Sequence, residues 1–192
     1  MSGELFVFKI VVGGAGGVGK TTLLHRYMHD VFKSDTKLTV GVTMQTKGIT
    51  HDGRKITLVL WDLGGQDQFR FLQPSFCKGA LAGIVFFDLT RFDTMLQVKD
   101  WVAMFRKHAT PGIPIILAGT KLDDVNPGKV EEVMQVAKET ATQLGLTICE
   151  PTSSKTGEGV AEIFKRVVDI LVGQSRGGKE KPSPKRRPGI TS

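Results

Sequence analysis

The sequence lacks long hydrophobic runs and contains only two cysteines in 192 residues. No apolar run approaches the roughly 20 residues that a membrane-spanning helix needs. Cys77 and Cys149 lie far apart in the chain, so we expect no disulfide framework and a reducing compartment. The opening segment MSGELFVFKI has neither a basic leader nor a cleavage site, which argues against a signal peptide. These features favour a cytoplasmic protein.

Lipid attachment signals are missing as well. Ser2 stands where N-myristoylation needs glycine, and the terminal PGITS carries no prenylation cysteine. Most of the net charge of +7 lies in residues 173–192, which contain six basic residues and one acidic residue, Glu180. We expect a folded domain over 1–172 and a disordered basic tail over 173–192. The tail is either simply solvated or makes weak contact with anionic membranes, peripherally and worth ~1 kcal/mol per basic residue.

Hydrophobic patterns along the folded part alternate between strand-like and helix-like segments. Strands are expected at 5–12, 42–50, 55–62, 81–88, 113–119 and 146–150, and helices at 21–28, 92–105, 130–144 and 160–171. Asp52-Gly53 between two strand-like runs is typical of a tight hairpin turn. Alternating strands and helices predict an α/β fold: a mostly parallel six-stranded sheet with one antiparallel edge hairpin and helices on both faces.

Five glycines fall within seven positions (13–19) between the first strand and the first helix. Residues 14–21, GAGGVGKT, match the phosphate-binding pattern G-x-x-x-x-G-K-[ST] in its required context. Backbone N–H groups and the following helix N-terminus solvate anions there, and side chains would block the approach. Lys20 is expected to reach phosphate oxygens and Thr21 to bind Mg²⁺.

Four further segments occur in a fixed order with this loop. They are FKSDTKLTVGV (32–42), WDLGGQD (61–67), TKLD (120–123) and TSSK (152–155). In this combination, over residues 5–172, the chain resembles the Ras superfamily of small GTPases. The resemblance implies a G domain of the P-loop NTPase type that binds GTP or GDP with Mg²⁺ and hydrolyses GTP slowly, as a molecular switch in membrane traffic or signalling.

The resemblance also implies residue roles. Gln66 would orient the attacking water, aided by Lys20 and Thr39, and the metal would lie on Thr21, Thr39 and Asp62. Asp123 would select guanine, between the stems of Lys121 and Lys155. The residues expected to contact nucleotide are Gly14, Gly16, Gly17, Val18, Gly19, Lys20, Thr21, Thr22, Phe32, Thr39, Gly65, Thr120, Lys121, Asp123, Ser153, Ser154 and Lys155.

Two loops, 33–42 and 63–77, are expected to respond to the γ-phosphate and to contact effectors, exchange factors and GTPase-activating proteins. No arginine lies between Phe32 and Gly41, so an activating partner is expected to supply one, accelerating hydrolysis about 10³–10⁵-fold.

Gly64 stands where Ras and Rab proteins carry alanine and resembles the Arf and Gα version, so the subfamily stays open. Two adjacent glycines should make the second loop mobile.

Other functions are weighed against this interpretation. An ATP-dependent kinase or ATPase would leave TKLD and SSK without a purpose, and a scaffold that never hydrolyses would lose Gln66 or Thr39. A nucleic-acid binder would need a base-reading module, and none is seen, so we expect no nucleic acid as a partner. We also expect a monomer. His25 and His29 have no third metal ligand nearby and are expected to form a solvated helix face. Cys77 is expected near the second loop and exposed, with a lipid or redox role a remote alternative.

Overall fold

The computed structural model describes residues 5–34, 39–148 and 151–177. The strands are β1 (Leu5–Gly14), β2 (Val42–His51), β3 (Arg54–Leu63), β4 (Ala82–Asp88), β5 (Ile115–Thr120) and β6 (Thr147–Ile148). The helices are α1 (Lys20–His29), α2 (Gln73–Cys77), α3 (Phe92–Leu96), α4 (Val98–His108), α5 (Pro127–Leu144) and α6 (Val160–Gly177), with single 3₁₀ turns at Asp67–Phe69 and Leu122–Asp124.

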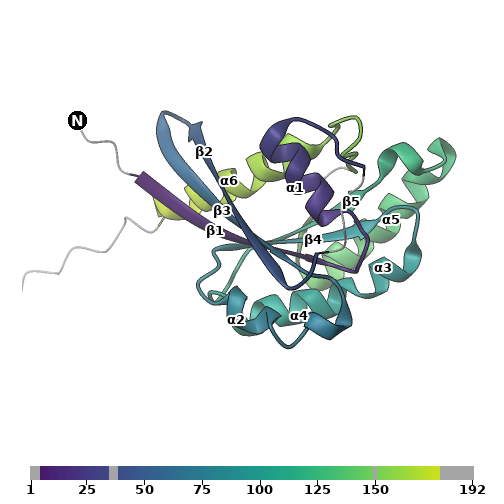
Figure 1. Cartoon of the computed structure of the whole chain (residues 1–192), viewed down its shortest axis with the longest axis horizontal. Coiled ribbons are helices and arrows are strands. Elements are labelled where there is room, and N and C mark those ends of the chain that lie inside the picture. The colour runs from purple at the N-terminus through teal and green to yellow at the C-terminus, as the bar shows by residue number, and fades with distance from the viewer. Residues whose placement is uncertain (1–4, 35–38, 149–150, 178–192) are drawn as a thin grey trace, which may run out of the picture.

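The strands form one six-stranded sheet in the order β2-β3-β1-β4-β5-β6 (Figure 1). Only the pairing of β2 with β3 is antiparallel among these strands. Their turn consists of Asp52 and Gly53, both with positive φ (47° and 72°), as a tight two-residue hairpin requires. The predicted α/β class, the mostly parallel sheet and the antiparallel edge hairpin are confirmed.

Helices cover both faces of the sheet (Figure 1). On one face α1 and α6 pack together, and the ring of Tyr27 stacks on that of Phe164 with centroids 3.7 Å apart. On the other face α2, α3, α4 and α5 bury a second cluster that includes Trp101 and Phe105. The central strands β4 and β5 are buried along their whole length, as their continuous apolar sequences predicted.

The structure differs from the sequence expectations at three segments. The helix expected over 92–105 is two helices, and Phe92 and Leu96 are exposed (62% and 59%) because the buried stripe of the second helix begins only at Val98. Helix α6 continues to Gly177 and so includes the first five residues of the expected tail, 173–177. The last strand is confined to Thr147–Ile148, and Cys149 lies outside the described residues.

Cys77 is also corrected: its thiol is fully buried against the α4 side of the sheet rather than exposed. Burial raises the pKa of Cys77 to about 11, although the charge of Lys9 opposes this slightly. A neutral, buried thiol is a poor nucleophile, so neither a redox role nor a lipid attachment is supported. Among the described residues, no helix has the length and hydrophobicity that a bilayer crossing requires.

The four inner strands β3, β1, β4 and β5 all run parallel, so their carboxyl ends share one edge of the sheet. The register pairs Val12 with Asp62 and Asp88 with Thr120 near that edge. The loops that follow these strands therefore converge there, which is where open α/β sheets place their ligands.

Candidate nucleotide site

A cleft of about 310 Å³ opens at the carboxyl edge of the sheet. Its lining is Gly16, Gly17, Val18, Gly19, Lys20, Thr21, Thr22, Phe32, Ser34, Thr39, Gly65, Gln66, Thr120, Lys121, Asp123, Asp124, Ser154 and Lys155. Of the residues predicted from the sequence, Gly14, Asp62 and Ser153 do not line the cleft and are instead buried beside it. Ser34 and Asp124 line the cleft although no motif pointed to them.

The glycine-rich loop forms one wall of the cleft. Gly14, Gly17 and Gly19 have positive φ angles of 137°, 73° and 93°, a conformation that other residues rarely adopt. A Cβ on Gly14 would lie 2.3 Å from the carbonyl oxygen of Phe86 in the neighbouring strand β4. Helix α1 begins directly after this loop, so its first N–H groups, which have no intrahelical partner, lie at the cleft.

Lys20 is almost completely buried at the floor of this loop. Its ammonium donates to the carbonyl oxygens of Gly14 (2.7 Å) and Ala15 (3.0 Å). Burial lowers the pKa of Lys20 to about 8, and the negative charge of Asp62 only partly offsets this. The protein thus holds a cation with little compensation from its own carboxylates, an arrangement suited to a polyanionic ligand.

Two hydroxyls and a carboxylate meet next to Lys20. The Thr21 hydroxyl lies 2.5 Å from the Thr39 hydroxyl and donates to Oδ2 of Asp62 at 2.5 Å, while Thr39 lies 3.4 Å from that same oxygen. Oδ1 of Asp62 is buried and has no hydrogen-bond partner among the described residues. Oxygen ligands of this kind suit Mg²⁺, which is commonly held by few protein oxygens plus water and phosphate.

Other groupings suited to a metal are missing from the described part of the chain, where no cluster of three or more His, Cys, Asp or Glu side chains occurs. The rings of His25 and His29 contact each other at a tilt of 49°, with centroids 4.7 Å apart, and Nδ1 of His25 lies 3.1 Å from the carbonyl oxygen of Val31. His25 is half-buried and His29 is exposed on α1.

The segment after β3 closes directly over the glycine-rich loop. A Cβ on Gly65 would lie 2.5 Å from the carbonyl oxygen of Gly14 and 2.6 Å from the ammonium of Lys20, so only glycine fits. A Cβ on Gly16 would lie 3.9 Å from Cγ of Gln66, in ordinary contact. The Gln66 side-chain carbonyl accepts a hydrogen bond from Gln68 (2.8 Å).

The far end of the cleft is built around Asp123. Its Oδ1 accepts a 2.5 Å hydrogen bond from Ser153, and its Oδ2 lies 3.8 Å from the ammonium of Lys155. Ser153 therefore orients the carboxylate from behind while Lys155 lies at its side. Phe32, 37% exposed, lines the same cleft. The structure thus brings the predicted base-recognition residues together in one place.

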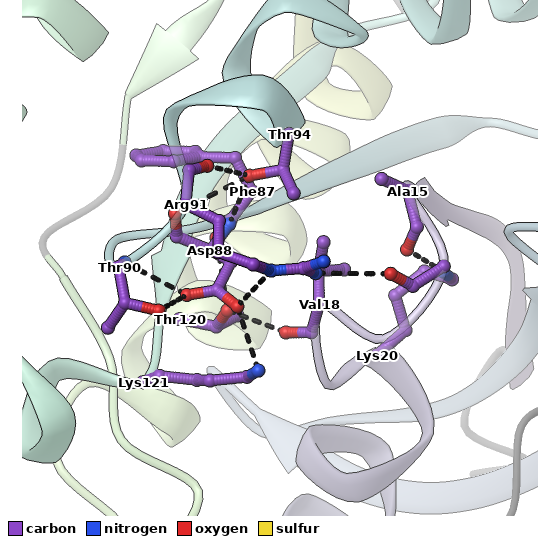
Figure 2. A network of polar contacts seen from close by, with 11 residues as sticks. Ala15, Val18, Lys20, Phe87, Asp88, Thr90, Arg91, Thr94, Thr120 and Lys121 are labelled. Carbon is purple, nitrogen blue, oxygen red and sulfur yellow. Dashed lines mark hydrogen bonds and ion pairs between the residues drawn. The ribbon is translucent and has the colours of Figure 1, made fainter.

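The two ends of the cleft are also linked to each other through β4 and β5 (Figure 2). The Thr120 hydroxyl donates to the carbonyl oxygen of Val18 at 2.6 Å. Lys121, with a positive φ of 63°, lies 2.8 Å from Asp88, and Arg91 lies 3.0 Å from that same carboxylate. Asp88 and Arg91 were not predicted from the sequence. The signal that could have indicated Asp88 is an acidic residue at the end of a fully apolar strand.

Comparisons with known proteins agree with this geometry. The family model described as "Ras family" matches residues 9–173. The Arabidopsis thaliana Ras-related protein RABA5b is 34% identical over 168 residues, which cover 86% of this chain and 75% of the relative. Human Ras-related protein Rab-4B is 32% identical over 177 residues, which cover 92% of this chain and 82% of the relative. The Arabidopsis thaliana Ras-related protein RABA3 is 37% identical over 166 residues, which cover 86% of this chain and 69% of the relative.

The named relatives are Rab proteins, which favours a Rab-like member over the Arf-like alternative that Gly64 suggested. Both the motif order and the family match extend over nearly the whole described fold. The chain belongs to the Ras family, as a Rab-like small GTPase, and is a GTP hydrolase.

Proposed function

We propose that the cleft binds GTP and GDP together with Mg²⁺, and that the chain acts as a slow GTP-hydrolysing switch in membrane traffic. One observation supports this most: a single cleft has an anion-binding loop with a buried lysine at one end and an oriented carboxylate, Asp123, at the other. A phosphorylated purine nucleoside has the matching chemistry at its two ends.

At the phosphate end, Gly16, Gly17 and Gly19 leave the main chain bare for approach, and Lys20 supplies the charge. A bound phosphate would replace the carbonyl oxygens that the ammonium now contacts, and anionic oxygens are stronger acceptors than carbonyls. Val18 and Thr22 contribute through their position in the loop and the first turn of α1.

Thr21, Thr39 and Asp62 are the proposed metal residues. These three side chains would hold Mg²⁺, whose positive charge would stabilise the negative charge that develops during phosphoryl transfer. The unpaired Oδ1 of Asp62 is the observation that supports this assignment, because a buried carboxylate oxygen otherwise has a partner. Burial raises the pKa of Asp62, against the opposing effects of the Thr21 hydrogen bond and the Lys20 charge.

Hydrolysis requires a water placed in line with the γ-phosphate. We assign this positioning to Gln66, which lines the cleft next to Gly65, and we assign the γ-phosphate contact to the Gly65 N–H. No arginine is among the cleft-lining residues of the described structure. Hydrolysis by the isolated chain is therefore expected to be slow and to depend on an activating partner that supplies one.

At the base end, Asp123 would accept two N–H groups from the guanine edge, which adenine does not present. Thr120, Ser154 and the stems of Lys121 and Lys155 would surround the base, with Phe32 against it. A site that contains a dedicated hydrogen-bonding pair strongly rejects analogues that lack it. An ATP-dependent enzyme remains the rival hypothesis, and it gives Asp123 no role.

The switch surface is proposed to comprise 33–42 and 63–77, of which 35–38 lie outside the described residues. Val40 and Phe71 are each 75% exposed there, apolar groups suited to effector, exchange-factor or activating proteins. Membrane contact of a monomeric, soluble or peripheral protein through its basic tail is part of the proposal. Its test is vesicle flotation of the full chain against a 1–177 truncation, which leaves α6 complete.

The nucleotide proposal is tested by calorimetry with GDP and ADP in the presence of Mg²⁺. Asp123→Ala should weaken GDP binding at least about 30-fold, since a charged double hydrogen bond is lost. Asp124→Ala is the matched control, because that carboxylate also lines the cleft and should change the affinity less than about threefold. Equal affinity of the unaltered chain for GDP and ADP would overturn the proposal.

A further inference from the structure

Two loops that are distant in the sequence form the two ends of the cleft, and both contact the segment after β4. This segment begins at Asp88, the last residue of β4, whose side chain is completely buried. It continues through Thr90 and Arg91 into α3. Neither Asp88 nor Arg91 lines the cleft, so any effect on nucleotide must pass through the residues that they hold.

Asp88 is surrounded by donors from three directions (Figure 2). Its Oδ2 lies 2.8 Å from the ammonium of Lys121 and accepts from Nε of Arg91 at 3.0 Å. Its Oδ1 accepts from the backbone N–H (2.9 Å) and the hydroxyl (2.6 Å) of Thr90. Burial alone would raise the pKa of Asp88, but these hydrogen bonds outweigh it and lower the pKa. The carboxylate is therefore ionised at neutral pH.

Arg91 extends the network to the phosphate-binding loop. While Nε is bonded to Asp88, Nη2 of the same guanidinium donates to the carbonyl oxygen of Gly16 at 3.1 Å. Nη2 would also lie 3.7 Å from a Cβ on Gly17. The planar guanidinium can hold both partners at once because its donors point in fixed directions. Arg91 thus contacts the loop without lining the cleft itself.

The result is a continuous chain of contacts from the Gly16 carbonyl through Arg91 and Asp88 to Lys121. Lys121 is a lining residue of the base end, and its left-handed backbone (φ 63°) is one that a non-glycine residue needs tertiary support to keep. Gly16 is a lining residue of the phosphate end.

We propose that Asp88 and Arg91 are positioning residues that lock the phosphate-binding loop to the base-recognition loop and thereby slow the release of guanine nucleotide. This inference rests on the proposed function of the cleft. Because a nucleotide bridges both loops, it leaves faster when either can move independently. Loss of the Arg91 side chain releases the phosphate-binding loop at Gly16. Loss of the Asp88 charge releases both this loop and the base-recognition loop at Lys121.

A contribution to folding alone does not explain the arrangement. The Arg91 side chain is 41% exposed and its Asp88 contact is three residues away in sequence, so its net effect on unfolding is small. Its long-range partner is a carbonyl of the phosphate-binding loop, 75 positions away. The measurable consequence should therefore appear in nucleotide kinetics rather than in global stability.

The test measures dissociation of fluorescently labelled GDP from the full-length chain, chased with excess unlabelled GDP in Mg²⁺. Arg91→Ala should accelerate dissociation roughly three- to tenfold, the loss expected for one charge-assisted hydrogen bond at a half-exposed site. The dissociation rate of Arg91→Lys should lie between those of the unaltered chain and Arg91→Ala, because one ammonium cannot reproduce both guanidinium donors. Arg106→Ala is the matched control: it removes an arginine that also donates to one carbonyl, that of Leu144, far from the cleft.

A second readout distinguishes positioning from a general loosening. Arg91→Ala should weaken GDP binding more than GMP binding, since GMP lacks the phosphate that extends furthest along the loop held by Arg91. In the double variant with Asp88→Asn, the accelerations should combine to less than their product, as expected for groups in one network. The midpoint of thermal unfolding of Arg91→Ala should stay close to that of Arg106→Ala.

The outcomes are separable. A chain that binds GDP with dissociation unchanged in Arg91→Ala relative to Arg106→Ala overturns this inference and leaves the proposed function standing. Equal losses for GDP and GMP with a lowered unfolding midpoint would also overturn it, in favour of a structural role. A chain without affinity for GDP would instead overturn the proposed function. Should Asp88→Asn fail to fold, the Arg91 variants decide alone.

Discussion

Replacement of Gly64 by alanine is a sharp test of how the two proposed switch loops depend on each other. The Gly64 N–H donates to the carbonyl oxygen of Gly41 at 2.8 Å. A Cβ on Gly64 would lie 2.7 Å from that oxygen and 2.9 Å from the carbonyl oxygen of Thr39. Both obstacles are backbone atoms, so no side-chain rotation relieves the contact. The segment that carries Thr39 must move away.

The cost follows from these distances. Overpacking of this kind costs about 1–3 kcal/mol, and the hydrogen bond to Gly41 is strained at the same time. If the cost falls on the arrangement that holds the Thr39 hydroxyl 2.5 Å from Thr21, that arrangement becomes about 5- to 150-fold less populated. Thr39 is proposed to bind Mg²⁺ on the γ-phosphate side, so binding of the triphosphate should be weakened more than binding of GDP.

The assay is dissociation of a fluorescent, non-hydrolysable GTP analogue and of labelled GDP, each in Mg²⁺. Gly64→Ala should accelerate loss of the analogue at least about fivefold, the low end of that range, and change GDP dissociation less than threefold. Gly48→Ala is the control, because a Cβ there meets nothing within 4 Å and φ is not positive. If both variants release the analogue at the same rate, or if Gly64→Ala affects GDP equally, the coupling argument is wrong.

Three further predictions concern buried groups. In a Cys149→Ser chain, the remaining thiol of Cys77 should resist a thiol reagent at pH 8 until the protein unfolds, because a pKa of about 11 leaves about 100-fold less thiolate than 9.0 would; rapid native-state labelling would contradict this. The lowered pKa of Asp88 means that its ionised form stabilises the fold above the ordinary carboxyl value of 3.8, and that this is lost as pH falls through the still lower folded value. The difference in free energy of unfolding between the unaltered chain and Asp88→Asn, measured with urea, should therefore be full at pH 6. It should begin to shrink only below the ordinary carboxyl value of 3.8, and a pH-independent difference would refute the prediction. Gly13→Ala should lower the free energy of unfolding by about 1–3 kcal/mol in urea titrations, since its Cβ would lie 2.3 Å from the Trp101 ring; an unchanged value would show that the ring moves aside.

Local patterns were sufficient to predict most of the fold. Continuous apolar runs predicted the buried strands β4 and β5, and Asp52-Gly53 predicted the hairpin, because strand burial and turn geometry are decided by neighbouring residues. The pattern failed at 92–105, where Phe92 and Leu96 fit a helical stripe but are exposed. Periodicity shows which side chains share a face, but not whether another element covers that face.

Cys77 and Gly64 show a second limit. The sequence predicts an exposed Cys77 near the second loop, yet α2 packs that residue into the core. Two adjacent glycines, Gly64 and Gly65, suggested a mobile loop, and that stays a prediction. The structure supplies a different reason for them: each lies where a Cβ would strike the backbone of another segment. Glycine in a sequence does not tell conformational freedom from close approach.

In the candidate site too, residues in local motifs could be predicted and residues with distant partners could not. Most residues that line the cleft were predicted from the sequence, since phosphate, metal and base chemistry dictates residue types at short spacings. Asp88 and Arg91 were missed because their partners, Lys121 and Gly16, come from different loops, so no local spacing connects them. The nucleotide affinity of this fold should accordingly depend on residues outside every motif. If substitutions at Asp88 and Arg91 leave nucleotide release untouched, the motif residues hold their geometry alone, and the polar network behind them serves only the fold.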